Sequence, residues 1–267
     1  REYWKFALKF NLPLIPHYLS MTILNQADRI MISRMIGTEE AAIYSVAYQI
    51  SMMMTIITTA INNSFVPYTY KEMKAKRYES IKKNSNILLM LIGIACIAAM
   101  CFGPEIIKIF AAKEYYDAIW VVPPVAASVY FIFVYSLFAN IEFYFEQTKF
   151  VMIASCGGAI ANLFLNYIFI PKYGYYAAGY TTLACYILFS VAHYYFHKKV
   201  LNKHSEIGAI YNMKFILSFS LILCLFMVFM PMVYGYMFVR YGILCVITIG
   251  LIIKRDSILI VVRQMKK

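Results

Sequence analysis

The chain has 267 residues, of which 62% are hydrophobic and only 14% are charged, and its formal net charge at pH 7 is +12. Because soluble domains carry about 25% charged residues, this composition excludes an ordinary soluble domain and indicates a polytopic membrane protein. The six cysteines all fall in apolar segments, which favours small buried side chains over a disulfide framework or a zinc site. The sequence begins with Arg1 rather than Met, and its first residues do not resemble a signal peptide, so we expect a piece of a longer protein.

Eight apolar segments of helical length are separated by short polar breaks. They cover approximately residues 11–34, 41–66, 85–104, 118–141, 150–171, 175–197, 215–233 and 236–253. A transmembrane helix needs about 20 apolar residues, whereas a membrane β-strand needs about 10 in an alternating pattern. The segments are long and do not alternate, so the sequence predicts an all-α bundle of eight transmembrane helices.

The distribution of basic residues predicts the topology. With eight spans, both termini and alternate loops lie on one side of the membrane. That side holds 19 of the 25 Lys and Arg residues, against five on the other side and Arg29 within a span. Because cytoplasmic loops are enriched in Lys and Arg, we expect both termini in the cytoplasm. The positive net charge is then explained by the excess of Lys and Arg in the cytoplasmic loops. This argues against nucleic acid as a partner and favours anionic membrane lipids.

The first span carries a group of polar side chains, in the segment YLSMTILNQADRIMISR. Each ionisable group at this depth costs about 2.5–3.5 kcal/mol on insertion scales. At about 100° per residue, one face of the helix is polar and Asp28 lies to one side of it. We expect this face to line a water-filled cavity, with Arg29 meeting an anionic ligand and Asp28 engaged by another helix. The alternative is that Arg29 snorkels to the interface and Asp28 is paired structurally. The members of the polar face are Tyr18, Thr22, Asn25, Gln26, Arg29 and Ser33.

A second polar stripe runs along the second span, with members three or four residues apart. They are Tyr44, Tyr48, Ser51, Thr55, Thr58 and Asn62. The stripe faces either a cavity or a neighbouring helix, since hydroxyl groups at this spacing also form hydrogen bonds between helices. Tyr48 and Asn62 are candidates for contact with a substrate, and Asn62 is the stronger of the two.

Two pairs of ionisable residues have spacings that are found in catalytic or metal-binding sites. Glu142 and Glu146 lie one turn apart at the end of the fourth span, but with Lys149 nearby we expect a solvated helix end rather than acid–base catalysis or a cation site. His193 and His197 have the i, i+4 spacing of a metal pair, but the sequence offers no third ligand. We therefore expect no metal and no cofactor.

The last two spans carry few polar residues, so we expect them to pack at the periphery and to line no transport path. The tail KRDSILIVVRQMKK is basic with an apolar middle, and it predicts a short helix on the inner leaflet.

The fifth and sixth spans resemble a known family. The segment NLFLNYIFIPKYGYYAAGYTTLACY, which contains Asn162 and Asn166, is similar to the N-x-x-x-N-x-x-x-x-P-x-[YF]-G-x-x-[GA]-A pattern of polysaccharide flippases. The opening segment also resembles this family, with L-P, D-R, a short loop that contains Gly, Y-S-V-A and then Pro67. These proteins are the oligosaccharyl-lipid exporters of the multidrug/oligosaccharidyl-lipid/polysaccharide (MOP) exporter superfamily.

The resemblance implies two six-helix lobes around a central cavity that opens alternately to either side. Residues 1–200 would be the C-terminal lobe, and residues 201–267 would add two helices and a basic cytoplasmic tail. The substrate would be an undecaprenyl-diphosphate-linked oligosaccharide, moved from the inner to the outer leaflet of the bacterial cytoplasmic membrane to build lipopolysaccharide or capsule. A glycan polymerase and assembly proteins would be partners. Arg29 would meet the diphosphate, and Asp28 is the best candidate for proton or sodium coupling.

Three other functions stay open on sequence grounds. A cation-coupled small-molecule exporter of the same superfamily would need unpaired acids in its cavity, and the chain offers mainly Asp28. A membrane enzyme that processes glycans would need a cluster of His, Asp or Arg on its loops, which are short here. A scaffolding protein would not need Asp28 and Arg29 within a span.

Overall fold

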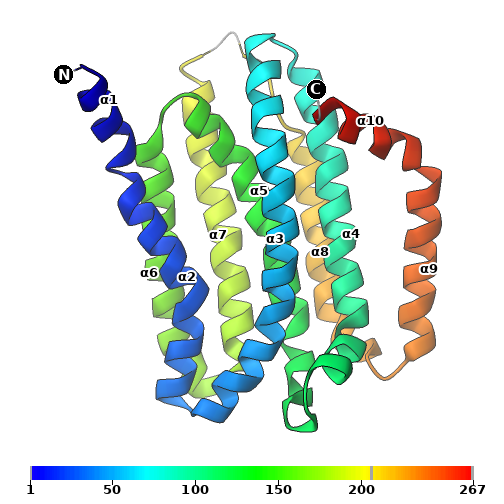
Figure 1. The fold of residues 1–267 in the computed structure, drawn as a ribbon. Helices are drawn as coiled ribbons and strands as arrows, with labels where there is room; N and C mark the ends of the chain where they lie inside the picture. Colours follow the sequence, from blue (N-terminus) through cyan, green and yellow to red (C-terminus); the bar gives the residue numbers. More distant parts are fainter. Residues whose placement is uncertain (1, 205–206, 266–267) are drawn as a thin grey trace. The chain divides into compact units, whose positions relative to one another are not determined.

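A computed structural model describes residues 2–204 and 207–265, and in it every predicted span is a helix (Figure 1). The described residues form no strand, so the predicted all-α class is confirmed. The elements are α1 (Glu2–Asn11), α2 (Leu14–Met35), α3 (Thr38–Lys74), α4 (Tyr78–Phe110), the 3-10 helix η1 (Lys113–Trp120), α5 (Val122–Tyr144), α6 (Thr148–Tyr173), α7 (Tyr176–Leu201), α8 (Met213–Val233), α9 (Met237–Ile253) and α10 (Arg255–Met265).

Five of these helices, α3, α4, α5, α6 and α8, are long and apolar enough to cross a membrane. The protein is therefore a multi-pass membrane protein. The apolar helix α9 is shorter, with 17 residues. Helices α2 and α7 carry buried polar side chains, which lower their hydropathy. Membrane crossing by α2, α7 and α9 stays a prediction.

Helices α3 and α4 are longer than the spans predicted for them. At about 1.5 Å per residue, they are roughly 55 and 50 Å long, against about 30 Å for the hydrocarbon core. Each of the two helices is therefore longer than the hydrocarbon core is thick. The turn between them is polar: Arg77 donates two hydrogen bonds to the Glu72 carboxylate, at 2.7 and 2.5 Å. Beside it, Asn84 of α4 donates to the Tyr68 hydroxyl of α3 at 2.7 Å.

The chain divides into two compact units. The first comprises Arg1–Ser45 and Val134–Ser205, and the second comprises Val46–Phe133 and Glu206–Lys267. Helices α3 and α5 each contribute to both units. The predicted division into residues 1–200 and 201–267 stays a prediction.

In the first unit, α2 packs along α6, and α6 packs along α7 (Figure 1). Gly158 of α6 faces the neighbouring helices: a Cβ atom there would lie 3.7 Å from the Phe189 ring and 3.9 Å from Leu24, which are ordinary contact distances. The adjacent Gly157 has nothing within 4 Å of such an atom. Gly174 ends α6 with φ +72°, and its N–H donates to Ile170 O at 2.9 Å. Because glycine adopts this backbone conformation without strain, the chain can turn there directly into α7.

In the second unit, α8, α9 and α10 all pack against α4. Arg240 of α9 is only 3% exposed, and it donates to both carboxylate oxygens of Glu105 and to the carbonyl of Cys101, at 2.6–2.7 Å. This ion pair fixes α9 to α4. The predicted helix in the C-terminal tail is confirmed as α10.

Candidate functional site

The most polar part of the first unit is a cluster centred on Asp28 of α2. One carboxylate oxygen accepts from the hydroxyl groups of Tyr44 (2.6 Å) and Thr182 (2.5 Å). The other oxygen accepts from the Asn166 amide at 2.6 Å. The expected contact of Asp28 with another helix is confirmed, since its partners come from α3, α6 and α7.

A second layer of hydrogen bonds holds these partners in place. The Asn166 amide also donates to the Asn162 carbonyl oxygen at 3.2 Å, and the Asn162 amide donates to Thr182 at 3.3 Å. Thr181 donates to the Asn166 carbonyl oxygen. Asn162 and Asn166 belong to the family-like pattern noted in the sequence, but nothing in the sequence marked Thr181 and Thr182 as members of the cluster.

The cluster is buried and its hydrogen-bond donors are all neutral. Asp28 is 2% exposed, and Asn162 and Asn166 are completely buried. A buried carboxylate without a counter-charge is costly. The cluster is therefore chemically suited to take up a proton or a small cation, and its carboxylate, amide and hydroxyl oxygens are ligands that hard cations prefer.

The side chains predicted to bind substrate lie near Asp28 in the sequence but have different surroundings. Arg29 is half-buried and donates to the Asn25 carbonyl of its own helix at 2.9 Å. The Asn25 side chain accepts from the Tyr186 hydroxyl at 3.4 Å. Gln26 is exposed and, with Thr22, lines an otherwise apolar groove of about 360 Å³ between α2 and α6.

Tyr48 and Asn62 both lie on the part of α3 that belongs to the second unit. Tyr48 is buried and Asn62 is half-buried. A shared cavity for these two residues and Arg29 stays a prediction.

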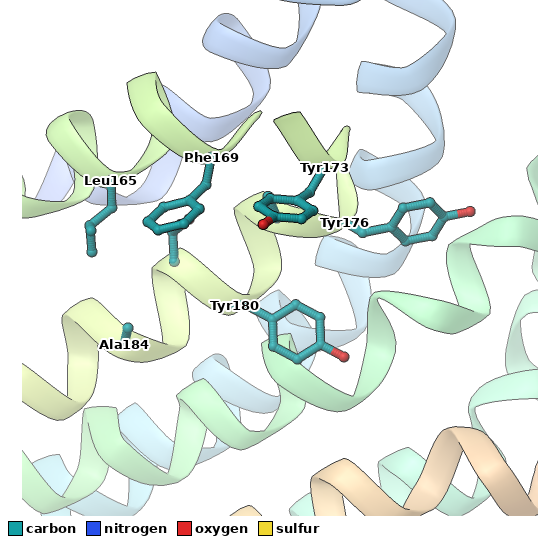
Figure 2. A pocket seen from close by; sticks show the side chains of 8 residues that line it. Leu165, Phe169, Tyr173, Tyr176, Tyr180 and Ala184 are labelled. Atoms are coloured by element: carbon teal, nitrogen blue, oxygen red, sulfur yellow. The ribbon is translucent and has the colours of Figure 1, made fainter. Parts of the chain in front are cut away.

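An open groove of about 510 Å³ lies between α6 and α7 (Figure 2). Phe169 and Tyr173 line it from α6, while Tyr176 and Tyr180 line it from α7 (Figure 2). Thr181, which donates to Asn166, also lines this groove. One side chain therefore joins the groove to the cluster around Asp28.

The prediction of a solvated helix end at Glu142 and Glu146 is wrong for Glu142. Glu146 is exposed, but Glu142 is fully buried, and its carboxylate lies 2.9 Å from Nδ1 of His193. The sequence spacing could not show this, because the partner lies on α7 and is 51 residues away. His197 instead packs against the ring of Phe138, with ring centroids 5.3 Å apart. The described residues contain no group of three His, Cys, Asp or Glu that could hold a metal ion.

Comparison with known proteins shows what the chain is similar to. The model of the family described as "Polysaccharide biosynthesis protein" matches residues 1–73, which include Asp28 and Arg29. A relative from Haemophilus influenzae, "Lsg locus putative protein 1", is 27% identical over 159 residues, which are 57% of this chain and 38% of that protein. An "Uncharacterized membrane protein" from the same organism is 23% identical over 175 residues, 62% of this chain and 43% of that protein.

Solved structures of MOP superfamily transporters have a similar fold. The outward-facing conformation of a multidrug resistance MATE family transporter matches with a TM-score of 0.57 and 19% identity, over 81% of this chain and 52% of that one. A MOP superfamily transporter from Pyrococcus furiosus gives a TM-score of 0.58 and 20% identity, over 84% and 53%.

Residues 1–73 are therefore similar to the polysaccharide biosynthesis family, and the fold of the chain is similar to that of MOP superfamily transporters. The chain spans about two fifths of the length of the two curated relatives and about half of the solved transporters. The resemblance of the opening segment is confirmed by the family model, whereas the resemblance of the segment that contains Asn162 and Asn166 stays a prediction.

Proposed function

We propose that this chain is part of a transporter that moves an undecaprenyl-diphosphate-linked oligosaccharide across the bacterial cytoplasmic membrane. A diphosphate and several sugars cannot cross hydrocarbon unaided, because their polar groups would lose hydration without replacement. The lipid tail need not leave the bilayer. A polar, cationic path beside the lipid is therefore sufficient, and no covalent bond has to change.

The observation that carries the proposal is that two neighbouring residues of α2 have complementary properties. Asp28 is a buried carboxylate that is suited to bind a cation, and Arg29 next to it carries a guanidinium group. Asp28 and Arg29 both lie in the segment that matches the polysaccharide biosynthesis family. Arg29 would bind the diphosphate, since guanidinium groups recognise phosphate oxygens with two parallel hydrogen bonds. Asn25, Gln26, Tyr48 and Asn62 would contact the sugars or the diphosphate.

Asp28 would couple transport to an ion gradient. Uptake of a proton or a sodium ion would remove the net negative charge of the cluster. Because its partners lie on α3, α6 and α7, a change in the charge of Asp28 would change the contacts of α2 with all three helices. A transporter needs such a link between ion binding and helix packing in order to move its substrate in one direction across the membrane.

Arg29→Ala in the full-length protein tests the substrate assignment, with delivery of lipid-linked sugar to the outer leaflet as the readout. We expect delivery to fall at least tenfold, and Arg29→Lys to retain part of it. Arg34→Ala is the matched control, since Arg34 is an exposed arginine at the end of the same helix. Normal delivery by Arg29→Ala would contradict the assignment.

A cation-coupled exporter of small molecules is the alternative, and the MATE-like fold is compatible with it. The two functions differ in what the arginine does. An exporter of cationic compounds would keep its activity, or gain activity, when Arg29 is replaced by Ala, whereas delivery of an anionic lipid-linked sugar would fall.

A further inference from the structure

A second buried ionisable pair lies in the first unit and shares no residue with the cluster around Asp28. Oε1 of Glu142 on α5 lies 2.9 Å from Nδ1 of His193 on α7, and neither side chain is exposed at all. The proposed function uses neither residue.

The surroundings of the pair are mostly aromatic. Phe189 meets the His193 ring edge-on with centroids 4.6 Å apart, and Tyr135 stacks on it at 5.5 Å. His17 of α2 interacts electrostatically with His193. Other titratable or charged groups near the pair include His197 on the next turn of α7 and, around a surface pocket one turn beyond Glu142, Lys9, Glu146 and Lys149. Helix α7 also carries Lys198 and Lys199 near its end.

Two atoms of the pair are buried without a hydrogen-bond partner in the described part of the chain. They are Oε2 of Glu142 and Nε2 of His193. A buried polar atom without a partner costs about 1–3 kcal/mol, and such atoms are few in native proteins. In a purely structural pair, both atoms would be expected to have hydrogen-bond partners. The two unpartnered atoms therefore indicate that the pair can form interactions beyond those between Glu142 and His193.

The charge of the pair depends on how many protons it holds. With one proton, it is neutral overall, either as carboxylic acid and imidazole or as carboxylate and imidazolium. With none, it carries a net negative charge, and with two a net positive charge. A net charge in this aromatic setting is costly.

We propose that Glu142 and His193 form a proton-binding site that holds one shared proton at neutral pH. Release transfers that proton to water and leaves the Glu142 carboxylate beside a neutral His193 ring. The contact between α5 and α7 then carries an uncompensated negative charge and becomes weaker. The site would let proton uptake or release act on helix packing independently of Asp28.

The shared proton determines the direction in which the stability of the folded state changes with pH. Above the ordinary titration ranges of Glu and His, the unfolded chain holds no proton at these two residues, whereas the folded pair holds one. The folded state is therefore favoured at lower pH and loses stability as pH rises. The folding equilibrium constant should fall about tenfold per pH unit from about pH 7 upward, until the folded pair releases its proton.

Unfolding of the purified protein in detergent at a series of pH values tests this, with Glu142→Gln and His193→Gln compared with the unaltered protein. We expect Glu142→Gln to remove the tenfold decrease per pH unit, whereas His193→Gln leaves a buried carboxyl group that can still hold a proton and should retain a decrease. Glu146→Gln, which changes the exposed carboxylate of the same segment, should retain it. Equal pH dependence in the unaltered protein and Glu142→Gln would overturn the proposal, because an ionised carboxylate bonded to a neutral imidazole holds no extra proton.

A spectroscopic measurement on the unaltered protein covers the case in which the variants do not fold. At pH 7 we expect either the infrared carbonyl band of a protonated carboxylic acid at Glu142 or nitrogen resonances that show both ring nitrogens of His193 protonated. A carboxylate band together with a neutral His193 ring would refute the shared proton.

Discussion

Replacing Asp28 with Ala would remove the acceptor of three buried hydrogen bonds. The donors are the hydroxyl groups of Tyr44 and Thr182 and the amide of Asn166, at 2.5–2.6 Å. None of these three residues is more than 1% exposed, so none can turn to bulk water when the carboxylate is lost.

The loss of stability follows from the three unsatisfied donors. One such donor costs about 1–3 kcal/mol in soluble proteins. Hydrogen bonds between membrane helices average about 0.6 kcal/mol, because the unfolded chain in a membrane finds other partners. For three donors in one network, we expect Asp28→Ala to lower the free energy of unfolding by about 2–3 kcal/mol. Asp28→Asn retains one acceptor oxygen and should lose about half as much.

Unfolding by a denaturing detergent, followed by circular dichroism, measures this change. Asp256→Ala is the control, because the Asp256 side chain is 83% exposed on α10 and should change stability by less than about 0.5 kcal/mol. If Asp28→Ala unfolds within about 0.5 kcal/mol of the unaltered protein, the hydrogen bonds of Asp28 do not hold α2 to its neighbours, and the reasoning is wrong.

Three further substitutions test the packing by the same assay. Gly93→Ala would place a Cβ atom 2.1 Å from the ring of Phe219, and we expect a loss of about 1–3 kcal/mol; an unchanged stability would show that α8 does not pack closely on α4. Gly158→Leu should destabilise the protein clearly while Gly157→Leu should not, because only Gly158 faces neighbouring side chains, and equal effects would contradict this orientation of α6. Arg240→Met should cost about 1–2 kcal/mol, since it leaves a partly exposed carboxylate without its partner, and no loss would mean that the ion pair does not fix α9.

The helices of this protein could be predicted from local patterns. Apolar segments of about 20 residues are long enough to cross a bilayer, and each of the eight predicted segments coincides with a helix. Asp28 could also be singled out, because an ionisable residue in an apolar helix is costly wherever its partners lie. The likeness of the opening segment to polysaccharide flippases was also visible in the sequence, and the family model matches residues 1–73.

The partners of those residues were decided by the tertiary structure. Thr182 lies 154 residues from Asp28, and His193 lies 51 residues from Glu142. Helix formation and membrane partition depend on residues that are near in sequence, whereas a contact between helices depends on how each helix is rotated and shifted against the next. For that reason Glu142 was expected in water and is instead buried against an imidazole, while the sequence alone sufficed to place Asp28 among polar neighbours.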